Sequence, residues 1–352
     1  MAAPTLVEIH ANGLRFETLV AGPDDEETVI LLHGYPQSAE SWRETMEWLA
    51  SRGYRSIAPN LRGYSPGANP PEASAYSMSH LVADVLAIAD AQDVERFHLV
   101  GHDWGGALAW AVAGSHPTRL LSLTAVSTPH TLAMLEAMRG RSQSLRSAYM
   151  LFFRVRRVPE AMLNFANLTP AGLGLQLTRL PRASWRRDRA QLRRVGGLHG
   201  PLNWYRGAIT RSTRQHRVSV PTMYVWGRRD PFFGRRAAEG TAKYVTGPYR
   251  FEEIKAGHWI MDRNAREFQR LLGQHLDSNR APAQVAAAHA AVADENPPAT
   301  RKRAPRAKTD PATSPKPRAK RAPKPPSHGS ATRAAGASDG RRQPSGQAAA
   351  RR

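Results

Sequence analysis

The sequence predicts an α/β fold, in which a mostly parallel β-sheet is flanked by helices. Short apolar runs alternate with amphipathic helical patterns over most of residues 1–278, as in parallel strands joined by helical crossovers. Residues 130–216 interrupt this alternation and read as helical throughout, which is how an inserted cap domain would look. From residue 279 onward the composition becomes that of a disordered tail.

Each expected element follows from a local pattern. The apolar runs that we expect to form the sheet are Thr28–Leu32, Arg55–Ala58, Phe97–Val100, Leu121–Val126, Thr222–Trp226 and Tyr249–Ile254. The helical patterns between and after them are Glu40–Ser51, Ser79–Ala91, Gly105–Ser115 and Asn264–His275. Near the start, Asn12-Gly13 separates two further runs, Val7–His10 and Leu14–Val20, and this dipeptide is typical of a two-residue β-hairpin.

The charge distribution supports a division into three parts. Residues 130–216 hold 16 Lys or Arg and 3 Asp or Glu, whereas residues 1–129 hold 7 and 15. We therefore expect an α/β core formed by residues 1–129 and 217–278, a basic helical cap formed by residues 130–216, and a disordered tail formed by residues 279–352.

The tail is strongly basic. It contains no aromatic residue, 11 of the 27 prolines, and 16 Lys or Arg against 4 Asp or Glu, so it carries +12 of the formal +21 charge. Such a segment cannot bury a core. Within it, residues 301–324 interleave Lys and Arg with Pro and Ala, a pattern that binds nucleic acids or other polyanions without reading their sequence, or that only solubilises the chain.

The absence of cysteine excludes disulfides, thiolate nucleophiles and cysteine-based metal sites. No run of 18 apolar residues is present, and the first residues lack the pattern of a signal peptide. We therefore expect a cytoplasmic protein without a membrane span.

The sharpest local motif is Gly101-His102-Asp103-Trp104-Gly105-Gly106, which stands between an expected strand and an expected helix. Small residues on both sides of Asp103 permit the strained strand-to-helix turn of a nucleophile elbow. The central carboxylate can displace a leaving group from saturated carbon and form an alkyl ester. The alternative is that Asp103 only caps the following helix.

Two further residues complete a triad in the order nucleophile, acid, base. Asp230 follows the expected strand Thr222–Trp226, and His258 follows the last one. Loops at the carboxyl ends of strands are where an open α/β sheet places its site. A histidine oriented by a carboxylate can take a proton from water, although His258 could also be an ordinary loop histidine.

A third motif, His33-Gly34-Tyr35-Pro36, ends the strand Thr28–Leu32. Its tight turn can direct the backbone N–H of Tyr35 into the site, where the N–H of Trp104 would join it as an oxyanion hole. We expect Tyr35, Pro36 and Trp104 to contact substrate. His33 and His102 are interpreted as structural.

Together these motifs make the chain resemble the soluble epoxide hydrolase family of α/β-hydrolases. The resemblance covers roughly residues 5–277 and rests on His33–Pro36, Arg62–Ser65, Gly101–Gly106, Asp230 and His258. The sequence departs from the family pattern at Asn60, where an acidic residue is usual, and at Ser65, which replaces a frequent glycine. The resemblance implies hydrolysis of an epoxide to a vicinal diol, with water as the second substrate and without a metal or cofactor.

Two segments of the expected cap carry the same resemblance. Tyr149–Phe153 and Gly200–Arg206 resemble the segments that bear the two cap tyrosines of the family, which implies that Tyr149 and Tyr205 meet the epoxide oxygen. Because ring opening expels an alkoxide, a phenol that donates a proton would assist it. Without the resemblance, both residues would be interpreted as packing aromatics.

Two other functions stay open. A haloalkane dehalogenase shares an elbow Asp followed by Trp, but usually carries Asn where Tyr35 stands and lacks the paired tyrosines. A polyanion-binding protein with an inactive hydrolase body would rely on residues 301–324.

Overall fold

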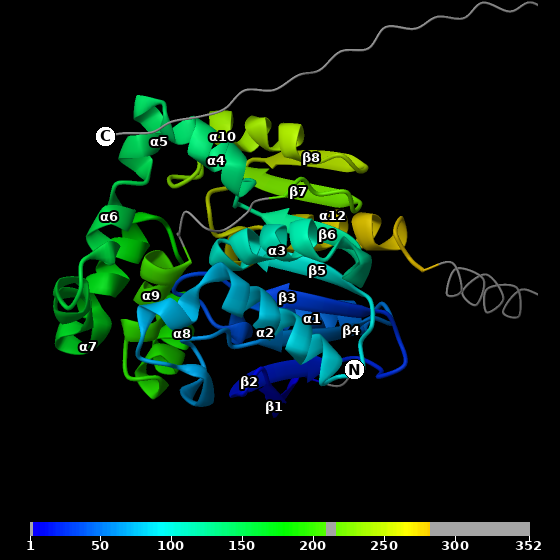
Figure 1. The fold of residues 1–352 in the computed structure, drawn as a ribbon, viewed down its shortest axis with the longest axis horizontal. Coiled ribbons are helices and arrows are strands. Elements are labelled where there is room, and N and C mark those ends of the chain that lie inside the picture. Colours follow the sequence, from blue (N-terminus) through cyan, green and yellow to red (C-terminus); the bar gives the residue numbers. More distant parts are fainter. Residues whose placement is uncertain (1–2, 209–215, 282–352) are drawn as a thin grey trace, which may run out of the picture. The chain divides into compact units, whose positions relative to one another are not determined.

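An eight-stranded sheet runs through the computed structural model, which describes residues 3–208 and 216–281 (Figure 1). Its order is β1-β2-β4-β3-β5-β6-β7-β8, with β1 and β2 antiparallel to their neighbours and the others parallel. The strands are β1 (Thr5–Ala11), β2 (Leu14–Ala21), β3 (Thr28–Leu32), β4 (Arg55–Pro59), β5 (Phe97–His102), β6 (Leu120–Val126), β7 (Thr222–Gly227) and β8 (Tyr249–Ile254). The expected strands and the hairpin are confirmed to within two residues at each end.

The turn between β1 and β2 has the backbone conformation that the dipeptide Asn12-Gly13 favours. Asn12 and Gly13 both have positive φ, 48° and 73°, as the two central residues of a type I′ turn require. That turn matches the right-handed twist of the two strands, and it sets the register in which Ala11 pairs with Leu14.

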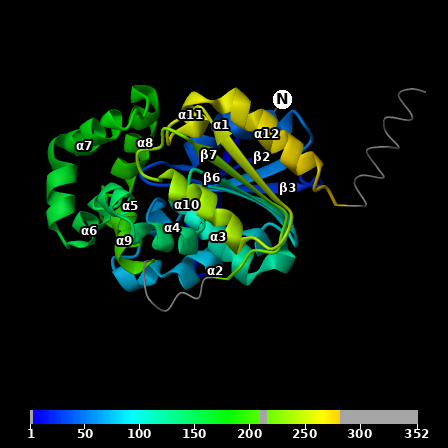
Figure 2. The ribbon, with the colours of Figure 1, turned by 90° about the horizontal axis from the view of Figure 1, so that it is seen from above.

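Helices cover both faces of the sheet (Figure 2). On one face lie α2 (Met78–Asp90) and α3 (Trp104–Ser115), which pack in the same core as Ile30 and Leu32. On the other face lie α1 (Arg43–Ala50), α11 (Ile260–Arg263) and α12 (Ala265–Asp277), which pack with Val29 and Leu31. The alternation of side chains along β3 therefore supplies both cores, and its continuous apolar run follows from burial on both sides.

The four expected helices are present, and two short helices that the sequence did not predict, α10 (Arg235–Gly240) and α11, are present as well. Single 3₁₀ turns add Ala39–Trp42, Pro66–Ala68, Ala73–Tyr76, Pro117–Arg119 and Thr241–Tyr244. No helix of the described residues is both long and apolar enough to cross a bilayer.

Six helices lie between β6 and β7 in the described part of the expected cap, which contains no strand. They are α4 (Thr131–Met138), α5 (Arg141–Arg146), α6 (Tyr149–Arg154), α7 (Val158–Leu177), α8 (Arg182–Arg194) and α9 (His199–Gly207). Helix α7 is broken between Phe165 and Leu168, where three consecutive residues have left-handed φ. The division into core and cap stays a prediction.

The last described residues, which follow residue 278, still contact the folded body of the protein. The guanidinium of Arg280 lies 4.6 Å from the ring centroid of Tyr54, and the N–H of Ala281 donates to Glu27. The remaining tail, with its predicted disorder and the basic segment 301–324, lies outside the described residues.

Candidate active site

Asp103 stands at a sharp turn between β5 and α3. Its backbone has φ 52° and ψ −119°, a conformation that costs energy in any residue with a side chain and that concentrates at functional sites. The flanking glycines permit the turn, because a Cβ on Gly101 would lie 2.2 Å from the carbonyl oxygen of Gly105. The side chain of Asp103 forms no helix-capping hydrogen bond, so capping does not explain this residue.

The three expected triad residues meet at this turn. His258 Nδ1 lies 2.8 Å from Asp230 Oδ2, and His258 Nε2 lies 3.5 Å from Asp103 Oδ2. Asp230 is held in turn by the backbone N–H groups of Phe232 and Phe233, which donate to its Oδ1 at 2.7 and 3.0 Å. The imidazole is therefore fixed between two carboxylates, and backbone N–H groups orient that of Asp230.

The other oxygen of Asp103 faces the turn after β3. The backbone N–H of Tyr35 donates to Asp103 Oδ1 at 2.8 Å. The N–H of Trp104 belongs to the first turn of α3, where N–H groups have no acceptor within the helix. One of the two N–H groups predicted to form the oxyanion hole, that of Tyr35, is thus hydrogen-bonded to the Asp103 carboxylate. The catalytic roles of both N–H groups stay a prediction.

Gly34 allows this close approach, and its replacement gives a direct test. A Cβ at Gly34 would lie 2.3 Å from the Cβ of Asp103, so Gly34→Ala must displace the carboxylate or the turn. We expect turnover to fall by about 100-fold or more, because misplacement by about 1 Å can have that effect. In the control Gly240→Ala, the new Cβ meets only Ala133 at 3.5 Å, and steady-state turnover should be unchanged. Equal activity of the two variants would contradict this account.

The electrostatics of the pair follow from burial and opposite charge. Burial would raise the pKa of Asp103, but the hydrogen bond and charge of His258 hold it below its usual value. For His258, burial alone would lower the pKa, but the charges and hydrogen bonds of Asp230 and Asp103 outweigh it and raise the pKa to about 10. The two carboxylates therefore favour the protonated, imidazolium form of His258.

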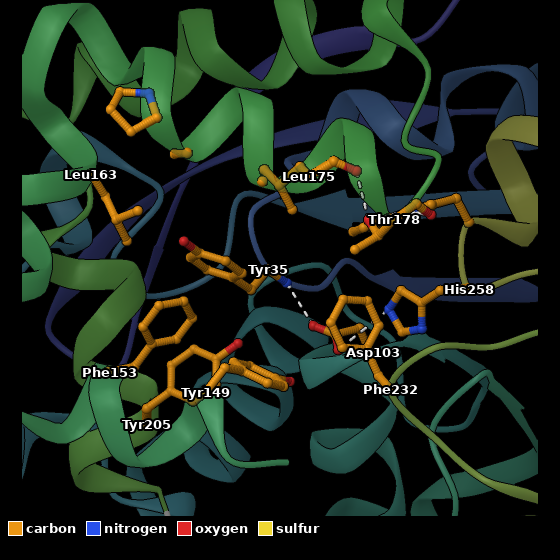
Figure 3. A pocket seen from close by; sticks show the side chains of 14 residues that line it. Tyr35, Asp103, Tyr149, Phe153, Leu163, Leu175, Thr178, Tyr205, Phe232 and His258 are labelled. Atoms are coloured by element: carbon orange, nitrogen blue, oxygen red, sulfur yellow. Dashed lines mark hydrogen bonds and ion pairs between the residues drawn. The ribbon is translucent and has the colours of Figure 1, made fainter. Parts of the chain in front are cut away.

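A cavity of about 230 Å³ opens above Asp103 (Figure 3). Its walls are mostly apolar, and its polar side chains include Asp103, His258, Tyr35, Tyr149 and Tyr205. In Figure 3 the rings of Tyr149 and Tyr205 lie beside one another, with their hydroxyl groups on the side of the cavity where Asp103 lies. The cavity can therefore hold a small apolar molecule against the carboxylate and the phenols.

Aromatic packing holds the two tyrosines. The Tyr205 ring packs edge-to-face on Trp104 at 5.0 Å and on Phe153 at 4.9 Å between centroids. Tyr149 packs on Phe232 at 5.5 Å. Burial, and then charges that include Asp103, raise the pKa of both phenols, so each keeps its proton at neutral pH.

Two of the three residues expected to contact substrate do not line the cavity. Among the described residues, neither Trp104 nor Pro36 lines the cavity, whereas Tyr35 does. The Trp104 side chain packs against Trp204 and Tyr205 instead. Their contact with substrate stays a prediction.

Several residues support the site through contacts that the sequence does not predict. His102, interpreted as structural, lies with Nε2 3.1 Å from the carbonyl oxygen of His258 and Nδ1 2.9 Å from Gln37 Oε1. Gln37 donates to Asp262, which is paired with Arg187 of α8. No local sequence pattern indicates these contacts. The dipeptide Asp230-Pro231, however, is a recognisable turn signal, and it could have indicated that the following backbone N–H groups donate to the Asp230 side chain.

Comparison with known proteins decides the family. A family model described as alpha/beta hydrolase fold matches residues 27–265. Epoxide hydrolase 4 of Mus musculus is 31% identical over 266 residues, which are 72% of this chain and 74% of that protein. Epoxide hydrolase A of Mycobacterium tuberculosis is 30% identical over 319 residues, covering 78% and 98% of the two chains. The chain belongs to the epoxide hydrolase family of α/β-hydrolases.

A solved structure agrees with this placement. The crystal structure of Epoxide Hydrolase A from Mycobacterium thermoresistibile superposes with a TM-score of 0.67 at 26% identity, covering 79% of this chain and 99% of that one. The expectation that the chain is an epoxide hydrolase family member is thereby confirmed.

Proposed function

We propose that this protein hydrolyses an epoxide to a vicinal diol through a covalent alkyl ester of Asp103. One observation carries the proposal: the carboxylate of Asp103 is held between the Tyr35 N–H and His258, and it faces a cavity that also receives the hydroxyls of Tyr149 and Tyr205. The names of the relatives point to the same substrate class.

In the first step, Asp103 Oδ2 attacks a ring carbon of the epoxide. A carbon–oxygen bond forms, the ring bond to the same carbon breaks, and the oxygen leaves as an alkoxide. Tyr149 or Tyr205 donates its phenolic proton to this oxygen. Asp103 Oδ1 keeps its hydrogen bond to the Tyr35 N–H and becomes the carbonyl oxygen of the ester.

The second step requires a neutral imidazole at His258. Once Asp103 is esterified it carries no charge, so one of the two carboxylates that raise the pKa of His258 is lost. The proton balance closes when the imidazolium returns a proton to the phenolate left by the first step. His258, oriented by Asp230, then takes a proton from water as the water attacks the ester carbonyl, and the Tyr35 and Trp104 N–H groups stabilise the oxyanion. The bond between the carbonyl carbon and the alkyl oxygen then breaks, the leaving diol oxygen receives a proton from the imidazolium, and the proton of the new carboxyl group returns to His258, which restores the Asp103 carboxylate.

A panel assay tests the reaction class. Styrene oxide, a cyclic epoxide, an epoxy fatty acid and a haloalkane should be incubated with the full chain, and diol and halide should be quantified. We expect diol from at least one epoxide and no halide. Release of halide without diol would replace the proposal by haloalkane dehalogenation.

A covalent Asp103 ester predicts where an oxygen label from water will appear. Because water attacks the ester carbonyl, its oxygen enters the carboxylate, and the diol carries away an oxygen of the original side chain. With excess enzyme in water labelled with heavy oxygen, the label should therefore appear in the peptide containing Asp103 and not in the first diol. A labelled first diol would indicate direct attack of water on the epoxide.

A further inference from the structure

The outer surface of α7 exposes large apolar side chains that the proposed chemistry does not use. Leu177 is 86% exposed, Phe165 71% and Leu173 60%, and the same segment exposes Val158 and Met162. Both views place α7 at the far end of the molecule, away from the sheet (Figures 1 and 2). Several large apolar side chains exposed on one segment indicate an interaction surface. We call residues 154–182 the α7 surface.

The charges around these apolar side chains have one sign. At the start of α7 lie three exposed arginines, Arg154, Arg156 and Arg157, and beyond its end lie Arg179 and Arg182. Helix α7 itself contains no Lys or Arg. The surface is therefore apolar along the helix and cationic at both ends.

The acidic residues of segment 130–216 do not offset this charge, because each is already paired. Glu160, the single acid in α7, is bound by Arg206. Asp188 is fully buried against Arg187, and Glu136 is paired with Lys243. The arginines at the two ends of α7 thus present net positive charge beside exposed apolar groups.

The opposite side of the same helix forms a wall of the cavity. Leu163, Ala171, Gly174 and Leu175 of α7 line the space above Asp103, while Leu173 and Leu177 point away from it into solvent. The two halves of α7 thus lie between the exposed apolar side chains and the candidate active site.

We propose that the α7 surface binds an anionic lipid bilayer and that the enzyme draws an apolar epoxide from it. An apolar stripe with cationic borders lies in the interface between lipid headgroups and acyl chains, while the basic residues contact anionic headgroups. A second copy of this chain fits less well, since a symmetric contact would bring the arginines of both copies together. The substrate part rests on the proposed function, whereas the binding part does not.

Vesicle binding of the full chain tests the docking surface. Affinity for phosphatidylcholine vesicles with and without phosphatidylglycerol should be measured by sedimentation at low and high salt, because the basic tail adds a salt-sensitive contribution that is the same in every variant. We expect Phe165→Ser with Leu177→Ser to weaken binding to anionic vesicles by about ten-fold or more, since each removes large apolar area from the lipid. Arg154→Gln with Arg156→Gln should also weaken it by about ten-fold, most clearly at low salt.

Matched controls lie outside the α7 surface. Leu6→Ser with Val7→Ser removes exposed apolar side chains from β1, and Arg266→Gln with Arg270→Gln removes exposed arginines from α12. Both should bind vesicles like the parent protein. Equal affinities for the α7 variants and the controls would overturn the proposal. An unchanged vesicle affinity together with an altered sedimentation coefficient of the α7 variants would assign the surface to a second copy.

The proposal that the enzyme draws its substrate from the bilayer is tested by comparing an epoxide dissolved in vesicles with a water-soluble one. A long-chain epoxide dissolved in anionic vesicles should be turned over about ten-fold more slowly by the Phe165→Ser, Leu177→Ser variant, while a water-soluble epoxide is turned over at the parent rate. Equal effects on both epoxides would overturn this part. If no epoxide is turned over by the parent protein, the proposed function fails, and the vesicle affinities still decide the docking surface.

Discussion

Replacing His258 by glutamine is expected to stop the enzyme after its first step and to leave substrate covalently attached to Asp103. Glutamine has no basic nitrogen, so it cannot take the proton from the water that attacks the ester. Alkylation needs the carboxylate and the phenols, whose side chains the substitution leaves in place, and because loss of His258 raises the pKa of Asp103 the reaction should be run at alkaline pH. Intact-mass spectrometry after addition of an epoxide should therefore show the protein with one added substrate mass, and peptide mapping should place it on Asp103.

Steady-state turnover of this variant should fall by about 100-fold to 10,000-fold, the range for loss of a positioned general base. His116→Gln makes the same change at an exposed histidine and should neither accumulate the adduct nor lose turnover. Asp103→Ala combined with His258→Gln should show no adduct. A His258→Gln protein that turns over normally, or that never gains the substrate mass, contradicts the assigned roles.

The sheet could be predicted from sequence because burial on both faces leaves a strong local signal. Thr28–Leu32 is apolar at nearly every position, and it forms β3 with the same bounds. The elbow could be predicted for a related reason. Backbone atoms approach Gly101 and Gly105 within 2.2 Å of where a Cβ would stand, so the sequence must keep glycine there, and that requirement is visible in the motif.

Other parts of the site depend on contacts between distant residues and left no local signal. Ser38 donates to Asp188 across 150 positions, which connects the turn after β3 to α8. The break in α7 at Phe165–Leu168 was also missed, because the apolar residues around it read as one continuous helical pattern. Asn167 and Pro170 are local signs of irregularity, since asparagine adopts left-handed φ more readily than most residues and proline disfavours a helical conformation in the residue before it.

Removing both cap hydroxyls, by Tyr149→Phe with Tyr205→Phe, is expected to nearly abolish alkylation of Asp103. The expelled alkoxide would lose the two phenols that meet it, and general-acid assistance is worth about 100-fold to 10,000-fold. The rate of adduct formation should be measured in the His258→Gln background, where the ester accumulates, so that alkylation is observed apart from hydrolysis.

The aromatic rings of Tyr149 and Tyr205 persist in the double variant, so their packing on Phe153, Phe232 and Trp104 should hold the fold. Its melting temperature should therefore stay close to that of the parent. Tyr54→Phe with Tyr224→Phe is the matched control, because both hydroxyls form hydrogen bonds outside the cavity, to Asp277 and to the carbonyl oxygen of Ser127. This control should lose stability but not the rate of alkylation. If the cap variant alkylates within a few-fold of the parent, the two phenols only pack, and displacement of a halide, which needs no proton donor, becomes the better account of the site.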